Sequence, residues 1–283
     1  MLSLHTNAAA LSAQNSISKT QSNLSTSQTR LSTGYRINSA MDDAAGLQIA
    51  SRLKAQTSGM TVAMRNTANS TSMLQTAEGA LDEVSNMLIR MKDLATQAAD
   101  ASSTDDDKTA MQAEYDALGL ELANVLKNTT FGGSTLLVGG TVDGAMTFQI
   151  GASSSETMEI DLSGDMSTLA SDVSAVSANY SAATTGTELT SAANATIGAL
   201  ETALASVNKV RSGLGAAANR LEHVYNNLAN ISTNTKNATG QIMDVDFASE
   251  SANMTSNQML LQASTAMLKQ ANSQSSLVMS LLQ

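Results

Sequence analysis

The 283-residue chain contains no proline, cysteine or tryptophan, and only 2% of its residues are aromatic. Because a proline inside a helix costs about 3 kcal/mol, its absence over this length favours long, uninterrupted helices. The missing cysteines exclude disulfides, thiolate metal sites and cysteine nucleophiles. Aromatic side chains usually supply much of the buried area of a core, so their scarcity favours long, thin helical packing over a compact α/β enzyme.

Basic residues are also few, and the formal net charge is −10. Nucleic-acid binding requires a basic patch, so we predict no nucleic-acid partner. Between Lys127 and Lys209 there is no lysine or arginine but there are eight acidic residues, and we expect this stretch to face solvent. No apolar run approaches the roughly 20 residues of a membrane span, and the ends lack the basic face of a membrane-surface helix. We therefore predict no membrane partner.

The two ends of the chain are short of charge and carry a seven-residue apolar repeat. Residues 1–41 contain no acidic residue, and residues 251–283 carry only Lys269. A heptad keeps one seam of a helix against a partner helix, so we predict that the ends pair as a coiled coil and are covered by other copies. The predicted self-assembly seam residues are Ile17, Leu24, Leu31, Leu261, Leu268, Val278 and Leu282.

The pattern between the ends predicts a mainly α fold. We expect a helix over about 5–33 that ends at Gly34, and a second helix to about residue 99 opened by a capping box at Ser39–Asp42. A third helix over about 105–127 would be capped by Ser103 or Thr104. Alternating residues predict a small β-hairpin unit over about 131–162, whereas 163–190 is ambiguous. Helical periodicity returns near residue 192 and continues, with a break at Gly240, into the C-terminal heptads.

These elements predict long antiparallel helices that form a rod, with a terminal coiled coil and a helical bundle that carries the hairpin unit. The predicted division is an inner-core coiled coil from residues 1–43 and 243–283, and an outer-core helical domain over 44–242.

No motif for nucleotide binding, metalloprotease activity or nucleophilic hydrolysis occurs in the chain. The acidic run Asp105–Asp107 fits the first turn of a helix, where the macrodipole favours negative charge, better than it fits a metal site. We predict a non-enzymatic protein without a cofactor or metal. An enzyme or exported toxin-like effector would need a polar constellation in a globular insert, which this sequence lacks.

Residues 31–50, LSTGYRINSAMDDAAGLQIA, strongly resemble the N-terminal signature of bacterial flagellins. Met41, Gly132 and Ser275–Ser276 depart from the residues usual in that family. The outer domains that many members carry before the C-terminal helix are also missing, so the chain resembles a short flagellin, such as those of lateral or polar filaments. Further matching segments are 88–95, 131–137, 148–151, 207–216, 219–221, 242–247, 262–263, 267–268, 270–272 and 281–282.

The resemblance implies a structural subunit of the extracellular flagellar filament that serves motility. It implies export through the flagellar secretion apparatus without a cleaved signal peptide, consistent with the lack of a basic and apolar leader. The implied partners are other copies of the chain, an export chaperone on the C-terminal segment, and hook-associated and filament-cap proteins. The alternative within the same architecture is a hook–filament junction protein.

The resemblance also implies roles for particular residues. Arg36, Asn38, Asp42 and Asp43 lie at the elbow between the two predicted domains, where inter-subunit contacts are expected. Arg90, Leu94 and Glu114 match positions that contact the innate-immune Toll-like receptor 5. In the free subunit we expect the ends to be largely disordered, because ordering costs about 1–2 kcal/mol per residue and the ends bury little.

Overall fold

The structure is a computed structural model that describes residues 7–281, with side-chain surroundings described as far as Ser273. The described residues form two compact units. Unit 1 comprises the described parts of residues 1–57 and 233–283, and unit 2 comprises Ser58–Ser232. The unit boundaries fall inside two long helices, whereas the boundaries predicted from the sequence fall at the ends of those helices.

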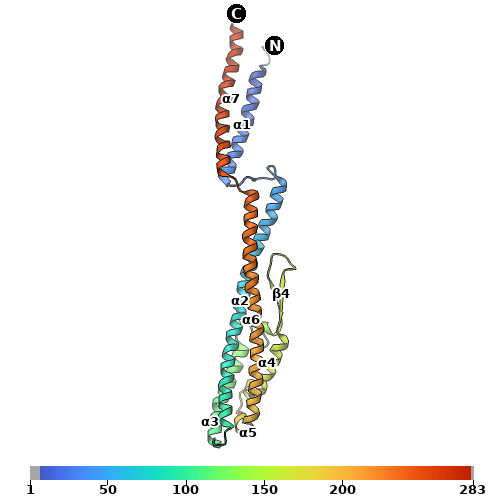
Figure 1. The fold of residues 1–283 in the computed structure, drawn as a ribbon, viewed down its shortest axis with the longest axis vertical. Helices are drawn as coiled ribbons and strands as arrows, with labels where there is room; N and C mark the ends of the chain where they lie inside the picture. Colours follow the sequence, from blue (N-terminus) through green and yellow to red (C-terminus); the bar gives the residue numbers. More distant parts are fainter. Residues whose placement is uncertain (1–6, 282–283) are drawn as a thin grey trace. The chain divides into compact units, whose positions relative to one another are not determined.

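The protein is mainly helical, as predicted, with α1 packed on α7, α2 packed on α6, and two small two-stranded sheets (Figure 1). Short 3₁₀ helices, η1 (Thr141–Asp143) and η2 (Ala178–Tyr180), occur in unit 2. The helices and strands are α1 (Ala8–Thr33), α2 (Ala44–Ala98), α3 (Asp105–Asn128), β1 (Thr130–Phe131), β2 (Ser134–Thr135), β3 (Ala145–Gln149), β4 (Thr157–Asp161), α4 (Ser163–Val176), α5 (Glu188–Ser191), α6 (Ala193–Met243) and α7 (Phe247–Leu281).

In unit 1, α1 and α7 form an antiparallel pair. Asn7 caps α1 by accepting a hydrogen bond from the Ala10 N–H at 3.1 Å, and its Nδ2 donates to the Ala271 carbonyl at 3.1 Å. At the other end of the pair, Arg30 Nη1 lies 3.7 Å from Glu250 Oε2. An early residue of α1 thus meets a late residue of α7, and the reverse holds at the other end. Within the described residues, both terminal segments are therefore helical, and α1 and α7 are paired.

The end of α1 follows the prediction. Gly34 adopts a left-handed conformation with φ 77°, and its N–H donates to the Arg30 carbonyl at 2.9 Å. Glycine adopts this conformation without the steric cost that a Cβ would bring, so it can stop the helix cleanly.

Unit 2 contains a continuous hydrophobic core. The core is built from α3, α4, the hairpin strands and the parts of α2 and α6 within residues 58–232. Leucine, valine and methionine fill most of it; Leu81, Leu169 and Val207 are fully buried. Tyr115 is the large aromatic member, and its hydroxyl donates to the Val176 carbonyl at 2.7 Å. Burial, followed by the nearby negative charges, raises the pKa of Tyr115, which keeps this donor protonated.

The stretch that was ambiguous in the sequence contributes directly to this core. Residues 163–176 form α4, and Met166, Leu169, Val173 and Val176 are buried at spacings of three and four. The expectation that residues 127–209 face solvent is therefore wrong for the apolar face of α4. Its acidic residues, Asp165 and Asp172, remain partly exposed, so this segment is amphipathic.

The predicted β-hairpin unit is confirmed. Strand β3 pairs antiparallel with β4, with Ala145 opposite Asp161 and Gln149 opposite Thr157. Along β4, Met158 and Ile160 are buried and their neighbours are exposed, which is the alternation of a half-buried strand. A second, two-residue hairpin, β1–β2, was not predicted. Gly132 and Gly133, at φ 58° and 88°, form its turn.

The helix starts and breaks agree only in part with the predictions. Thr104, one of the two predicted caps, caps α3, and it forms a capping box with Asp107 that was not predicted. Hydrogen bonds from Thr104 lower the pKa of the Asp107 carboxyl. The predicted break at Gly240 is wrong, because α6 continues to Met243 and the chain leaves the helix only in the following residues.

Candidate assembly surface

The facing sides of α1 and α7 consist of residues spaced alternately by three and four, the spacing of a coiled-coil seam. All of these side chains are half-buried except Ser27 and Glu250, which are buried. On α1 they are Ala10, Ala13, Ile17, Thr20, Leu24, Ser27 and Leu31, and on α7 they are Glu250, Met254, Asn257, Leu261, Ser264, Leu268 and Ala271.

The predicted seam residues Ile17, Leu24, Leu31, Leu261 and Leu268 are thus brought to the contact between the two helices. Their role in assembly stays a prediction. Val278 belongs to the part of α7 whose side chains are not described, and Leu282 lies outside the described residues.

The seam buries little apolar surface because only alternate layers carry large apolar side chains. The layers between them consist of alanine and small or polar residues, such as Thr20 on α1 and Ser264 on α7. Among the described residues of α1 and α7, no large apolar side chain is fully buried. Since full burial of a leucine contributes about 1.5–3 kcal/mol, half-burial in the pair leaves a large part of that stabilisation unrealised.

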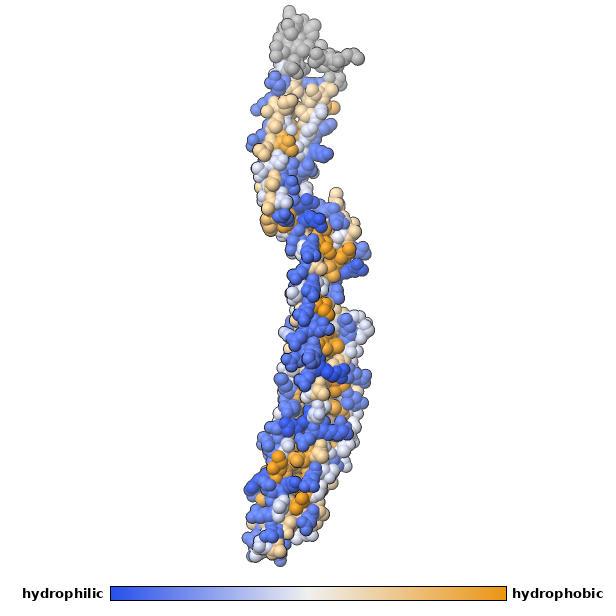
Figure 2. All heavy atoms as spheres, viewed as in Figure 1, coloured by the Kyte–Doolittle hydropathy of each residue, from blue (hydrophilic) through white to orange (hydrophobic). Residues whose placement is uncertain are grey.

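A second apolar stripe, which we call the outer stripe, lies on α7 away from the seam. It consists of Met259, Leu260, Ala263, Ala266 and Met267, which fall within an arc of about 120° at 3.6 residues per turn. Met259, Leu260 and Met267 are 60%, 53% and 65% exposed. On the face seen in Figure 2, hydrophilic and hydrophobic residues are intermixed over this helix pair.

The elbow is formed by two linkers of unit 1, residues 34–43 between α1 and α2 and residues 244–246 between α6 and α7. The linkers are joined by backbone hydrogen bonds. The Arg36 N–H donates to the Met243 carbonyl at 2.6 Å, and the Val245 N–H donates to the Gly34 carbonyl at 3.0 Å. The Arg36 guanidinium donates to the Ile242 carbonyl at 2.9 Å. The two linkers are therefore held as one element.

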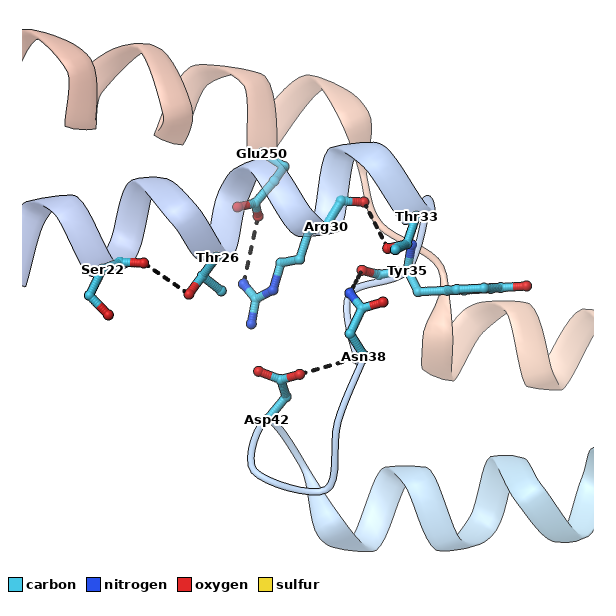
Figure 3. A network of polar contacts seen from close by, with 8 residues as sticks. All are labelled: Ser22, Thr26, Arg30, Thr33, Tyr35, Asn38, Asp42 and Glu250. Carbon is cyan, nitrogen blue, oxygen red and sulfur yellow. Dashed lines mark hydrogen bonds and ion pairs between the residues drawn. The ribbon is translucent and has the colours of Figure 1, made fainter.

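Within the first linker, Asp42 organises a tight turn (Figure 3). Its Oδ2 accepts hydrogen bonds from the backbone N–H groups of Asn38 and Ser39 at 3.0 and 2.9 Å. The Asn38 side chain donates to the Tyr35 carbonyl at 2.9 Å. The hydrogen bonds from Ser39 and Asn38 lower the pKa of Asp42. The carboxylate therefore stabilises the turn in its charged form.

The helix that follows is capped by a different residue from the one predicted. Asp43 Oδ1 accepts a hydrogen bond from the Gly46 N–H at 2.9 Å, and α2 begins at Ala44. The pair Ser39–Asp42 forms the preceding turn and does not cap the helix, so that prediction is wrong. The negative charge of an aspartate at this position also interacts favourably with the positive, N-terminal end of the helix dipole.

Two residues of the elbow were missed by sequence reasoning. Ile37 is 2% exposed and anchors the linker. Gly46 leaves space for it, since a Cβ on Gly46 would lie 2.8 Å from Ile37 Cδ1 and 2.5 Å from Asp43 Oδ2. The signals available in the sequence were an isoleucine between polar neighbours and a glycine close to the start of the predicted helix.

The three predicted receptor residues lie in unit 2 and divide into two groups. Arg90 on α2 and Glu114 on α3 are exposed and form an ion pair, with Arg90 Nη2 2.6 Å and Nε 2.8 Å from Glu114 Oε1. Leu94 is 3% exposed and belongs to the core. Leu94 therefore supports this surface from beneath and offers no accessible side chain to a partner.

Other kinds of site are not indicated within the described part of the chain. Across those residues, no group of three or more histidine, aspartate or glutamate side chains is placed to hold a metal ion. In the same part of the chain, none of the helices combines the length and apolarity that crossing a membrane requires. What the structure presents is a set of helix faces and an ordered elbow.

These features define a class of protein: a structural subunit whose terminal helices are only partly covered by its own chain. The comparisons with known sequences agree. The family model for the bacterial flagellin N-terminal helical region matches residues 4–141, and that for the bacterial flagellin C-terminal helical region matches residues 197–282. A flagellin of Halalkalibacterium halodurans is 41% identical over 254 residues, which cover 89% of each chain.

The chain therefore belongs to the bacterial flagellin family. Flagellins are structural, non-enzymatic proteins that polymerise into the extracellular filament of the flagellum, and this chain is a filament subunit. Polar flagellin F of Vibrio parahaemolyticus is 32% identical over 376 aligned positions, with 99% of each chain covered. Because this chain has only 283 residues, that relative carries inserted residues, and the chain is a short flagellin.

The solved structures support the fold. A putative flagellar hook-associated protein from Vibrio parahaemolyticus matches with a TM-score of 0.56 at 19% identity, over 72% of this chain and 100% of that one. At this identity the likeness concerns the arrangement of helices alone.

Proposed function

We propose that the α1–α7 pair is the polymerising element of this flagellin, and that subunits dock through its incompletely buried seam and its outer stripe. One observation carries the proposal: the large apolar side chains of this pair are half-buried or exposed, whereas those of unit 2 close into a core. Docking of further copies would complete the burial. A dozen such side chains supply enough free energy for association at about 1.5–3 kcal/mol for each leucine buried.

The low charge of the pair supports the same proposal. The charged residues of α1 are Lys19 and Arg30, and those of α7 are Glu250 and Lys269. Arg30 and Glu250 already face each other, so few charges would be desolvated when neighbouring pairs pack together. Head-to-tail contacts that do not close produce a helical filament and not a ring.

The elbow would contact neighbouring subunits in the filament. Arg36, Asn38, Asp42 and Asp43 are exposed, although their hydrogen bonds shape the loop that presents them. Met41 at the tip is 96% exposed, and an apolar tip on a rigid turn is suited to fit a neighbouring surface.

Before export, the apolar face of α7 would be covered by a chaperone. An amphipathic helix with an unpaired stripe is recognised by laying that stripe in a groove of the partner. The chaperone and a later subunit would then compete for the same side chains, and removal of the chaperone would be required before polymerisation.

For Toll-like receptor 5, the exposed pair Arg90 and Glu114 is the proposed contact. The paired side chains would have to exchange some of their mutual hydrogen bonds for bonds to the receptor. Receptor binding would be incidental to the bacterium, because the native role of these residues is to pack the helices of a filament subunit.

The experiment that tests the polymerising role compares the full chain with a chain lacking residues 243–283. Both are examined by electron microscopy under salting-out conditions, which strengthen apolar burial, with and without filament seeds. We expect filaments from the full chain and none from the truncated chain. Filaments from the truncated chain would overturn the proposal, and persistent monomers of the full chain even with seeds would favour the role of a hook–filament junction protein.

A further inference from the structure

Within the described residues, three methionines are exposed, and two of them lie on the outer stripe. Met259 and Met267 are 60% and 65% exposed, and Met41 in the elbow is 96% exposed. By contrast, Met91 and Met166 in the core of unit 2 are fully buried. The chain has no cysteine, so its thioethers are the side chains most readily oxidised by two-electron oxidants.

We propose that Met259 and Met267 are oxidation sites through which peroxides control filament growth. This inference rests on the proposed role of the outer stripe in subunit docking. Hydrogen peroxide transfers one oxygen atom to the thioether sulfur. The S–O bond forms as the O–O bond breaks, the sulfur loses two electrons, and the remaining oxygen leaves as water.

The product changes the stripe from apolar to polar at two positions. Met259 and Met267 are eight residues apart and flank Leu260, Ala263 and Ala266 on one face of α7. The flanked side chains contain no hydrogen-bond donor that could satisfy a sulfoxide oxygen once a neighbouring subunit has covered the stripe. Burial of such a polar group opposes association, so oxidised subunits dock poorly.

The exposure and position of Met259 and Met267 make their oxidation selective for subunits that are not yet assembled. Both sulfurs are reachable by a small oxidant in the free subunit, whereas they would be covered in the polymer. Because the proposed chaperone covers the same face before export, oxidation would act on subunits that have lost the chaperone and have not yet joined the filament. It would leave assembled subunits largely unmodified. Methionine sulfoxide reductases of the two stereospecific types reverse the change.

The test treats the purified full chain with hydrogen peroxide and maps the sulfoxides by peptide mass spectrometry. Treated and untreated subunits are then added to filament seeds, and the critical concentration for growth is measured. We expect sulfoxides at Met259 and Met267 and none at Met91 or Met166. We also expect a rise in critical concentration of about tenfold or more, since unsatisfied polar groups are buried on docking, and recovery after treatment with both reductases.

The matched pair carries Met41→Leu throughout, so that oxidation of the exposed elbow residue cannot contribute. The reference keeps Met259 and Met267, and the variant adds Met259→Leu with Met267→Leu, which preserves apolar volume and cannot be oxidised at these positions. Its critical concentration for seeded growth after the treatment should equal that of the same variant before treatment. The inference is overturned if these two methionines resist oxidation, if subunits carrying both sulfoxides grow as untreated subunits do, or if the treated variant loses growth as the treated reference does. Failure of untreated wild-type subunits to grow would instead count against the proposed docking role.

Discussion

The two units of this flagellin use the same kinds of residue with opposite results. In unit 2, leucine, valine and methionine from several helices and a hairpin close into a core in which many side chains are fully buried. In unit 1, the leucine and methionine side chains described on α1 and α7 stay half-buried or exposed. The difference lies in the number of elements available, because two helices can cover only one seam of each other. Unit 2 is complete within one chain, whereas under the proposed function unit 1 would be complete only among several.

The largest effect is expected from a matched pair of leucine truncations, one in each unit. Leu81→Ala removes a fully buried side chain from unit 2, and we expect the free energy of unfolding of the free subunit to fall by about 2–5 kcal/mol. Leu261→Ala removes a half-buried side chain from the seam, and we expect a loss below about 1 kcal/mol in the free subunit. Urea denaturation of the two variants measures both values.

The same pair should behave differently in polymerisation. Leu261→Ala should raise the critical concentration for seeded growth far more than its effect on the free subunit indicates. An equal loss of free-subunit stability in the two variants would show that unit 1 is already complete in one chain.

A smaller effect is expected from filling the space at the elbow. Gly46→Ala would bring a methyl group against Ile37 and Asp43, and such overpacking costs about 1–3 kcal/mol against a gain of about 1 kcal/mol in helix propensity. We expect a displaced elbow and impaired assembly with little change in the melting of unit 2. Gly79→Ala is the control in the same helix, since a Cβ there meets nothing within 4 Å. Normal assembly of the Gly46 variant would contradict the importance of this packing.

Removal of a single helix cap costs about 1 kcal/mol of stability. We expect each removal to affect only the unit that contains the cap. Thr104→Ala removes the capping box of α3, and we expect a fall of about 2–4 °C in the melting temperature of unit 2. Asn7→Ala removes both the cap of α1 and the hydrogen bond to Ala271, so it should weaken assembly while leaving that melting temperature unchanged. Calorimetry and seeded growth distinguish the two outcomes, and a common effect of both substitutions would argue against independent units.

The smallest expected effect concerns pH. Hydrogen bonds from Ser39 and Asn38 lower the pKa of Asp42 in the folded elbow. The stabilisation is therefore fully present above the unfolded value of about 3.9 and is lost as the pH falls through the lower folded value. Nuclear magnetic resonance titration of the Ser39 amide should report this transition below pH about 4. Asp42→Asn should abolish it, and an unchanged transition in that variant would assign it to another group.

The sequence was a good guide where local spacing decides the outcome. The heptads and Gly34 predicted α1 and its end, and Ser103 or Thr104 followed by acidic residues predicted the start of α3, because caps and seams depend on nearby residues. It was a poor guide where distant segments meet. The small residues of α4 concealed a buried face, and the burial of Leu94 depends on the helices that pack over it.

The elbow shows a further reason for failure. Serine and aspartate both commonly cap helices; here Asp43 caps α2, and Ile37 is buried close to Gly46 in the first turn of that helix. The hydrogen bonds between the two linkers join residues about 200 positions apart. No local pattern contains that information. The assembly role of the seam residues therefore stays a prediction, although the structure brings the described ones together.

The most direct test of the central claim is amide hydrogen exchange in free subunits and in filaments. If the terminal pair is completed only by neighbouring subunits, the amides of α1 and α7 should exchange rapidly in the free subunit and slowly in the filament. The amides around Leu81 and Leu122 in unit 2 should be protected in both states. Protection of α1 and α7 in the free subunit equal to that of unit 2 would contradict the account.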